Sequence, residues 1–230
     1  MHGAITKPID VWLKETNWDD QRRFESWASI ITNKKVLDFG CGAGGFLTKA
    51  KTLAAKAEGV ELELRVREHW LDQIMIYPNV ESVGDNRYDL ISAFHVIEHL
   101  RDPRAMLKAL STKLDRNGRI VIEVPSADDA LLTFYGCDAF QKFTYWSQHL
   151  FLFSAQTLRR LAEQAGLSIV AIQQHQRYTL SNHMHWLSQS ESGGHTKWGF
   201  LDSPELTAAY STALARMGKC DTLIAHLEAA

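Results

Sequence analysis

A glycine-rich segment with one carboxylate, VLDFGCGAGGF, combines residue types that bind a charged nucleoside. Gly40, Gly42 and Gly45 follow the pattern GxGxxG, and Asp38 lies shortly before the first of them. A strand that enters a glycine turn and then a helix usually presents backbone N–H groups to an anion. Asp38 would repel a diphosphate there by a few kcal/mol at about 4–6 Å. A cationic ligand reverses the sign of this interaction.

S-adenosylmethionine fits such a segment because it carries a sulfonium and an α-ammonium but no phosphate. Glycines let its amino-acid part approach the backbone, and Asp38 supplies an anion for the ammonium. Glu61 ends the next apolar segment, where an acid can accept hydrogen bonds from both ribose hydroxyls. Two alternatives stay open: a dinucleotide site, as in NAD-dependent oxidoreductases, and a plain strand-to-helix turn with Glu61 as a solvated strand end.

The segment His95-Val-Ile-Glu98-His99 places two imidazoles and a carboxylate close together. On a helix, His95 and His99 share a face, and Glu98 is adjacent to it. HxxEH also matches the inverted zinc-hydrolase motif, but no glutamate-bearing second helix completes such a site. Because imidazole titrates near neutral pH, His95 or His99 could take a proton from an attacking hydroxyl. The structural alternative is that Glu98 and His99 only tie a loop together.

Strands and helices alternate along most of the chain. We predict strands at 35–38, 57–61, 88–94, 119–124, 167–172 and 221–225, and helices at 19–31, 46–55, 64–76, 102–114, 154–166 and from 203 onward. Asn117-Gly118 predicts a turn before the strand at 119–124. The alternation predicts an α/β fold with a doubly wound, mainly parallel sheet. Two long connections, 126–148 and 173–202, are rich in His, Trp, Tyr and Gln, which predicts ordered cover over a site.

On these residues the chain resembles the class I S-adenosylmethionine-dependent methyltransferases. The similarity covers VLDFGCGAGG, GVELE, YDLISAFHVIEHLRDP and LDRNGRIVIEVPS in the family's order, and HLFLFSAQTLRRLAEQAGLSIV resembles the family's sixth-strand unit. The resemblance implies a Rossmann-like, seven-stranded sheet whose last strand, CDTLIAHLE, is antiparallel and lies between strands five and six. It implies one methyltransferase domain over 1–230, with helical cover (1–33), a cofactor-binding half (34–125) and a substrate-covering half (126–230).

The resemblance also implies a role for each cofactor-binding residue. These are Asp38, Gly40 and Gly42 for the methionine end, Glu61 for the ribose, Leu62 and Asp85 for adenine, and Phe94 beside the sulfonium and methyl group. Quinone-precursor O-methyltransferases carry a segment similar to HVIEH with Glu at position 95, and that trio resembles a divalent-metal site. Because imidazole prefers softer ions than Mg²⁺, His95 leads us to expect no bound metal.

The long connections supply the expected acceptor-binding residues. These are Tyr145, Trp146, Arg177, Tyr178, Asn182 and His183, and His149 joins His95, His99 and Glu98 as a catalytic candidate. Arg177 and the turn at 192–195 could hold a phosphate, as on a nucleotide-linked sugar; the alternative is an ion pair and a plain turn. The run QRY…SNH…WL…GGH resembles bacterial methyltransferases associated with surface-glycan building blocks.

The composition of the chain limits which binding partners and which cellular compartment we expect. The chain has 230 residues, a formal net charge of -2 and no basic run, so we expect neither a nucleic-acid polymer nor a membrane as partner. Three scattered cysteines without a CxxC pair argue against a disulfide framework, and no signal peptide or spanning segment is recognised. We therefore expect a cytoplasmic protein, and leave its oligomeric state open.

The predicted function is methyl transfer from S-adenosyl-L-methionine to a small-molecule acceptor, with S-adenosyl-L-homocysteine as product. The preferred acceptor atom is a hydroxyl oxygen, on a sugar or a nucleotide-linked sugar. A metal-assisted phenolic O-methyltransferase and a non-catalytic cofactor-binding partner in a complex are the alternatives.

Overall fold

The computed structural model describes residues 7–146 and 148–230, the side chain of Trp146 excepted. Its strands form one seven-stranded sheet of order β3-β2-β1-β4-β5-β7-β6, in which β7 is antiparallel. The last strand of the sequence thus lies between β5 and β6, and the predicted Rossmann-like α/β sheet is confirmed. The strands are β1 (Lys35–Phe39), β2 (Lys56–Val60), β3 (Ile76–Tyr77), β4 (Tyr88–Phe94), β5 (Leu114–Pro125), β6 (Leu167–His175) and β7 (Thr222–Ala229).

Helices occupy most of the segments between these strands. They are α1 (Ile9–Ile31), α2 (Gly45–Ala50), α3 (Leu64–Trp70), α4 (Pro103–Ser111), α5 (Ala130–Thr133), α6 (Asp138–Trp146), α7 (Ala155–Gln164), α8 (Leu180–Gln189), α9 (Gly194–Lys197) and α10 (Pro204–Met217), with short 3-10 helices η1 (Glu81–Val83), η2 (Ile97–His99) and η3 (Gly199–Leu201). Both long connections contain helices among the residues that the structure describes.

The described chain forms two compact units. The first contains the residues up to 94 together with 106–121 and 229, and the second contains 95–105, 122–228 and 230. The chain therefore passes from one unit to the other inside β5, close to the division after residue 125 that the sequence suggested. The segment 95–105, which follows β4, also belongs to the second unit.

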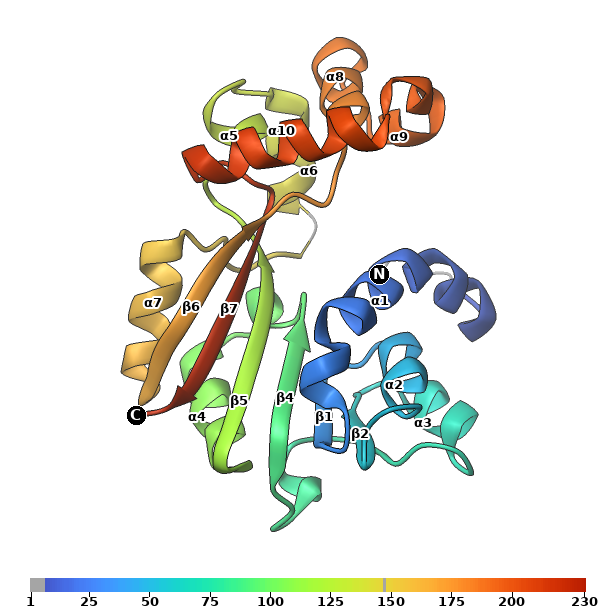
Figure 1. Cartoon of the computed structure of the whole chain (residues 1–230), viewed down its shortest axis with the longest axis vertical. Coiled ribbons are helices and arrows are strands. Elements are labelled where there is room, and N and C mark those ends of the chain that lie inside the picture. The colour runs from blue at the N-terminus through green and yellow to red at the C-terminus, as the bar shows by residue number, and fades with distance from the viewer. Residues whose placement is uncertain (1–6, 147) are drawn as a thin grey trace. The chain divides into compact units, whose positions relative to one another are not determined.

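The first unit holds the parallel strands β3, β2, β1 and β4 (Figure 1). β1 pairs in parallel with β2 and β4, so that Asp38 lies between Gly59 on one side and Ser92 on the other. A Cβ on Gly59 would lie 2.7 Å from Cδ1 of Leu47 and 2.8 Å from Sγ of Cys41. Glycine is needed there because β2 passes directly against the segment that follows β1.

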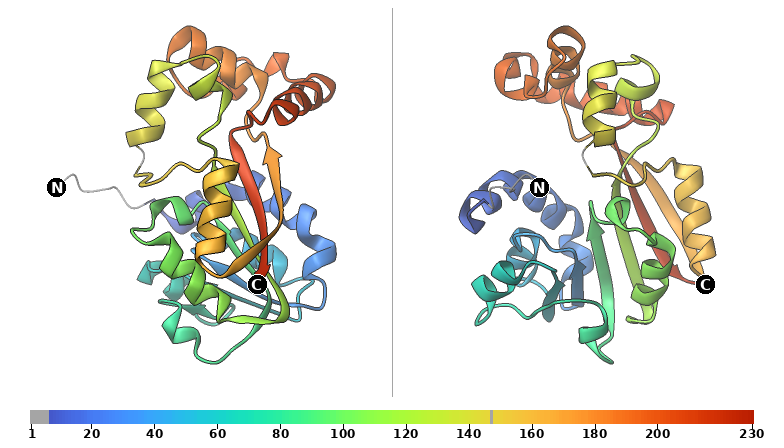
Figure 2. Two further views of the ribbon diagram at one scale, coloured as in Figure 1. Left: turned by 90° about the vertical axis from the view of Figure 1, so that its left-hand side faces the viewer. Right: turned by 180° about the vertical axis from the view of Figure 1, so that it is seen from behind.

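The second unit holds β6, β7 and the helices of the two long connections. Helix α7 lies alongside β6 (Figure 2), and its first turn is closed by a capping box of Ser154 and Thr157. Helix α10 begins with Ser203 as N-cap and Pro204 in its first turn, as its sequence predicts.

Four local predictions were wrong. Asn117-Gly118 makes no turn, because β5 runs through it from Leu114; a Cβ on Gly118 would lie 2.6 Å from the carbonyl oxygen of Tyr88, so this glycine permits a close backbone approach. The predicted helices at 46–55 and 64–76 end early, at residues 50 and 70. Helix α1 begins at Ile9 instead of residue 19, because its first turns pack Ile9 and Leu13 on the buried cluster around Trp70.

Candidate active site

The glycine turn after β1 is built in the first unit by backbone conformations that other residues rarely adopt. Gly40, Gly42 and Gly44 have φ angles of 71°, 52° and 85°, in the left-handed region where a Cβ is costly. The N–H groups of Gly40 and Cys41 both donate to the carbonyl oxygen of Val60, at 2.8 and 3.1 Å. The end of β2 therefore fixes the path of the turn.

Glu61 binds this same turn through its side chain. Its Oε2 accepts a hydrogen bond from the N–H of Gly42 at 2.9 Å, and its Oε1 accepts one from the N–H of Glu63 at 3.1 Å. Two backbone donors thus hold the carboxylate in one orientation beside the glycines. The ribose-binding role of Glu61 stays a prediction.

Asp38 is a buried carboxylate that forms no ion pair with the described residues. Its side chain is 3% exposed, and Oδ1 accepts a hydrogen bond from Oγ of Ser92 at 2.7 Å. Burial raises the pKa of Asp38 to about 7, although the Ser92 hydrogen bond and the Arg23 guanidinium both oppose the rise. A ligand ammonium would restore the ionised form of this carboxylate.

Helix α1 covers the glycine turn with side chains that sequence reasoning missed. The ring of Trp12 lies over Gly42, where a Cβ would be 3.1 Å from Cζ2. The carboxylate of Asp20 lies against Gly45, leaving no room for a side chain there. Arg23 lies 4.6 Å above the ring centroid of Phe94. These three residues of α1 fall on one helix face, and that spacing is the signal that could have found them.

The other predicted cofactor residues lie in more open surroundings. Leu62 is 81% exposed, and Asp85 is exposed in the loop before β4. Phe94 is half-buried at the end of β4 and makes an edge-to-face contact with Phe46, with ring centroids 5.2 Å apart. The roles of Leu62 and Asp85 toward adenine stay predictions.

In the second unit, His95 is held between two buried carboxylates. Its Nδ1 lies 3.1 Å from Oε1 of Glu98, and its Nε2 lies 3.2 Å from Oε1 of Glu123. Nη1 of Arg177 also lies 3.2 Å from that Nε2. Burial alone would lower the pKa of His95, but the hydrogen bonds to Glu123 and Glu98 outweigh burial and raise it. The site therefore favours an imidazolium.

The backbone of His95 is unusual as well. Its φ is 55°, a left-handed conformation that costs a non-glycine residue free energy and is concentrated at functional sites. Its N–H donates to the carbonyl oxygen of Glu123 at 2.8 Å. This turn directs the imidazole toward the carboxylates of Glu98 and Glu123.

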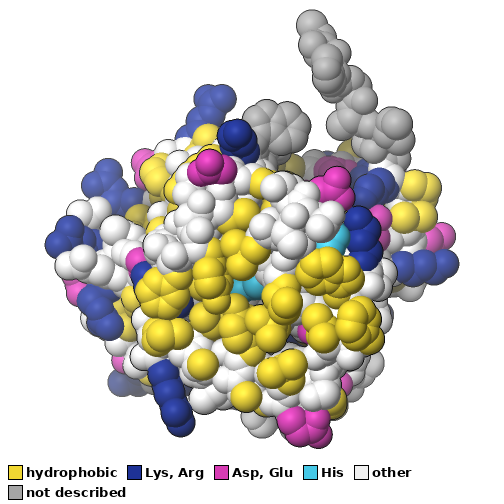
Figure 3. Space-filling model, turned by 90° about the horizontal axis from the view of Figure 1, so that it is seen from above, with side chains coloured by type: hydrophobic (Ala, Val, Ile, Leu, Met, Phe, Trp, Pro, Cys, Tyr) yellow, Lys and Arg dark blue, Asp and Glu magenta, His cyan; other side chains and the backbone are white. Residues whose placement is uncertain are grey.

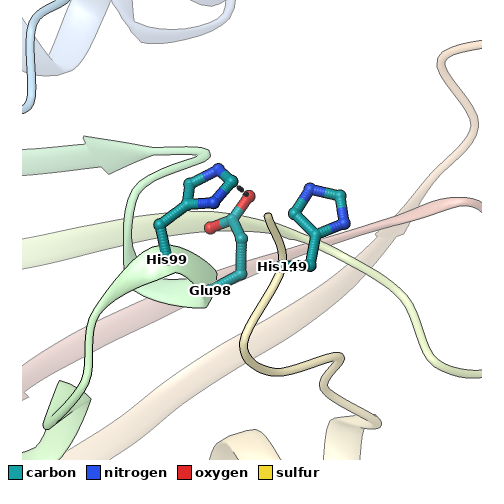
Figure 4. A group of neighbouring side chains, drawn as sticks. All are labelled: Glu98, His99 and His149. Atoms are coloured by element: carbon teal, nitrogen blue, oxygen red, sulfur yellow. Dashed lines mark ion pairs between the residues drawn. The ribbon is translucent and has the colours of Figure 1, made fainter. Parts of the chain in front are cut away.

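Glu98, His99 and His149 form a second cluster in this unit (Figure 4). The Glu98 side chain is fully buried, and its Oε2 has no hydrogen-bond partner among the described residues. Nδ1 of His99 lies 3.1 Å from the carbonyl oxygen of Gln148, and Nδ1 of His149 lies 3.1 Å from that of Thr144. Each ring therefore donates its Nδ1 proton to a backbone carbonyl, which leaves Nε2 as the ring atom that can accept a hydrogen bond.

Two adjoining cavities open among the helices of the second unit, with volumes of about 140 and 250 Å³. They share the lining residues Asp129, Phe140, Phe143, Tyr178 and Asp221. His95, His149 and Arg177 line the smaller cavity, and Asn182 and His183 line the larger one. Figure 3 shows hydrophobic side chains gathered around a hollow in which a histidine is visible.

Most of the predicted acceptor-binding residues thus line these cavities, but the aromatic wall differs from the prediction. Helix α6 contributes Phe140 and Phe143, whereas Tyr145 is 62% exposed and the side chain of Trp146 lies outside the described residues. Sequence reasoning also missed Asp129 and Asp221. Neither stands in a recognisable motif, and only the fold brings them together.

Comparison with known proteins assigns the family. A family model described as a methyltransferase domain matches residues 15–172, so the chain belongs to the methyltransferase domain family. The resemblance to class I S-adenosylmethionine-dependent methyltransferases is thereby confirmed. Among solved structures, a SAM-dependent methyltransferase from Archaeoglobus fulgidus shares the fold with a TM-score of 0.65 and 18% identity, over 94% of this chain and 98% of that one.

Two curated relatives show how wide this family is. The chain is 32% identical over 111 residues to the mitochondrial ubiquinone biosynthesis O-methyltransferase of Schizosaccharomyces pombe, covering 43% of this chain and 40% of that protein. It is 32% identical over 109 residues to tRNA U34 carboxymethyltransferase of Campylobacter hominis, covering 43% and 38%. The chain spans less than half the length of these relatives. Within the described residues, no helix is both long and apolar enough to cross a membrane.

The raised pKa of Asp38 predicts a specific loss of stability as pH rises. The folded-state pKa of about 7 exceeds the ordinary value of 3.8, so this contribution is complete below about pH 4 and is lost as pH rises through 7. Between pH 4 and 8, the free energy of unfolding of the wild type should fall more than that of Asp38→Asn, by a few kcal/mol at most. Chemical denaturation at each pH measures the difference.

The exposed Asp72 provides the control, because Asp72→Asn should follow the wild-type pH dependence. If the free energy of unfolding changes with pH in the same way for the wild type and Asp38→Asn, Asp38 ionises normally in the folded protein.

Proposed function

We propose that this chain transfers the methyl group of S-adenosylmethionine to a hydroxyl oxygen of a small polar acceptor, such as a sugar or a nucleotide-linked sugar. The observation that carries the cofactor assignment is the buried carboxylate of Asp38, whose pKa burial raises to about 7 despite the nearby guanidinium of Arg23. Beside it, Glu61 is oriented by the glycine turn to accept hydrogen bonds. A sulfonium nucleoside with an ammonium satisfies both groups, and a diphosphate satisfies neither.

The reaction needs in-line approach of an oxygen to the methyl carbon. The oxygen lone pair forms the new C–O bond, the C–S bond breaks with its electron pair going to sulfur, and the hydroxyl proton goes to a base. Positioning supplies much of the barrier reduction. His95 follows Phe94 directly in the chain, and ligands of such folds bind at the carboxyl ends of the strands.

We assign the base to His149 in preference to His95 and His99. Desolvation lowers the pKa of His149, which keeps its imidazole neutral near neutral pH, and the ring lines the smaller cavity. His95 faces two carboxylates and is better suited to carry positive charge. Together with Arg177 it would attract an anionic part of the acceptor, such as a phosphate.

A small acceptor is favoured over a nucleic acid by charge and by cavity size. The formal net charge of -2 gives no basic surface for a polymer of phosphates, and cavities of about 140 and 250 Å³ admit a sugar or a single ring. Because one of the relatives is a tRNA-modifying enzyme, a screen of acceptors should also include RNA.

Glu61→Ala should weaken binding of S-adenosylhomocysteine by about 1–3 kcal/mol, because ribose hydroxyls would lose their acceptor. Isothermal titration calorimetry measures the effect, and Glu68→Ala, at an exposed position of α3, should bind as the wild type does. No binding heat with the wild type would remove the proposed cofactor, and full affinity in Glu61→Ala would remove the role of Glu61.

His149→Ala should lower kcat about 10²-fold or more, the usual contribution of a general base, while leaving affinity for S-adenosylhomocysteine unchanged. Turnover is followed by release of S-adenosylhomocysteine over a panel of sugars, nucleotide-linked sugars, phenols and RNA. Equal kcat in wild type and variant would exclude His149 as the base, and turnover on RNA alone would exclude a small acceptor.

A metal-assisted O-methyltransferase is the second candidate, and one observation favours it. Oε2 of the buried Glu98 lacks a partner among the described residues, and the candidate ligand atoms of Glu98, His99 and His149 all lie within 4.8 Å of one another. Two imidazoles and one carboxylate suit a borderline ion such as Zn²⁺ better than Mg²⁺. When bound, such an ion would lower the pKa of a coordinated acceptor hydroxyl, and His149 would then be a ligand instead of a base.

Chelation separates the two candidates. If His149 acts as a base, activity should survive dialysis against EDTA, and the protein should contain less than about 0.1 metal ion per chain by mass spectrometry. Activity lost on dialysis and restored by Zn²⁺ or Co²⁺, but not in Glu98→Gln, would establish the metal-assisted reaction.

A further inference from the structure

Two buried carboxylates in the second unit, Asp129 and Asp221, line both cavities but differ in their hydrogen bonding. Both carboxylate oxygens of Asp221 accept hydrogen bonds. Its Oδ2 accepts from Nε2 of Gln176 at 2.8 Å and from the N–H groups of Arg177 and Tyr178 at 3.0 Å each. Its Oδ1 accepts from Oγ1 of Thr222 at 2.8 Å. These donors fix the carboxylate in one orientation, directly before β7.

Only one of the two carboxylate oxygens of Asp129 accepts a hydrogen bond from the described residues. It caps α5, and its Oδ1 accepts from the N–H of Leu131 at 2.7 Å. Its other carboxylate oxygen has no hydrogen-bond partner among the described residues, although the side chain is only 3% exposed. This oxygen is not sealed off from the cavity, so a donor on a ligand could reach it and complete the hydrogen bonding of the carboxylate.

On the side of the larger cavity, the charges around Asp129 favour a cation over a neutral donor, whereas Arg177 and His95 line only the smaller cavity. Asp221 adds a second negative charge; burial and that charge together raise the pKa of Asp129 to about 7. No lysine or arginine is among the described residues that line the larger cavity. His183 lines it too, but burial lowers the pKa of His183 to about 4, which leaves its ring neutral.

The remaining walls are aromatic. Phe140, Phe143, Tyr178 and Trp186 line the larger cavity, and Phe140 and Phe143 each contact Trp186 with ring centroids 5.3 Å apart. Ring faces attract cations, most strongly where water is excluded. Aromatic walls with a carboxylate at the base are suited to an organic ammonium group.

We propose that the larger cavity recognises acceptors that carry a protonated amine, which donates to the unsatisfied oxygen of Asp129. The proposal rests on the proposed function, since it takes the cavity to be the acceptor site. The bound amine is not the methylated atom, because an ammonium has no lone pair with which to attack a methyl group. Methylation would fall on another atom of the same molecule, in keeping with a hydroxyl acceptor.

The plain alternative is that Asp129 only caps α5. Asparagine caps helices as well as aspartate does, so Asp129→Asn keeps the hydrogen bond to Leu131 and removes the charge. The variant should therefore fold and melt as the wild type does. Asp129→Ser, which keeps a cap with a shorter side chain, serves as a second variant.

Benzylamine and benzyl alcohol are a matched pair of probes with nearly the same shape. In titrations followed by ligand-observed NMR, the wild type should bind benzylamine at least 10-fold more tightly than benzyl alcohol. Asp129→Asn and Asp129→Ser should bind the two probes within about 2-fold of each other, with affinity for benzyl alcohol unchanged. This expected ratio is that of one charge-assisted hydrogen bond in a partly desolvated site.

Equal binding of both probes to the wild type, binding of neither, or a preference for amine that persists in Asp129→Asn would each overturn the proposal. Titration of the same samples with S-adenosylhomocysteine separates the two assignments. Cofactor binding without amine preference overturns the amine site alone. Amine preference without cofactor binding overturns the methyl-transfer function and leaves an amine-binding cavity.

Discussion

The burial of one negative charge at the end of β1 sets the requirements for the rest of the first unit. Asp38 is fixed between β2 and β4 and bound to Ser92, so it cannot turn toward water. Because the cost of burying a carboxylate falls when a cation binds, the turn beside it is better suited to a sulfonium nucleoside than to a diphosphate. The glycines, Glu61 and the cover formed by α1 all surround that charge.

In the second unit, the chemistry of each histidine depends on its hydrogen-bond partners. His95 faces Glu98 and Glu123, which favours the imidazolium. His99 and His149 each donate a proton to a backbone carbonyl, and desolvation lowers the pKa of His149, which favours the neutral form of that ring. The HVIEH segment and the distant His149 therefore supply imidazoles of two kinds. His95 is suited to bind a negatively charged group, and His149 is suited to accept a proton or bind a metal ion.

The two cavities that we propose as the acceptor site carry charge of opposite sign at different places. Arg177 and His95 line only the smaller cavity, whereas Asp129 and Asp221 line both. Such a distribution suits a molecule with an anionic group at one end and a cationic group at the other, with a ring between aromatic walls. This charge distribution narrows the proposed class of acceptor more than family membership does, because the relatives include a ubiquinone biosynthesis enzyme and a tRNA-modifying enzyme.

Resemblance to the methyltransferase family implied the position of the last strand between β5 and β6, which the structure confirms. The sequence by itself determined the alternation of strands and helices and the glycine turn with its carboxylate, because these depend on local periodicity and on spacing within short segments. It could not determine which side chains meet. Asp129 comes from the start of α5 and Asp221 from the start of β7, and Trp12 reaches Gly42 only because α1 begins ten residues earlier than its acidic segment suggested. The tertiary structure decided these contacts, and with them the shifted pKa values of Asp38, His95 and Asp129, because burial and long-range hydrogen bonds set the free energy of ionisation.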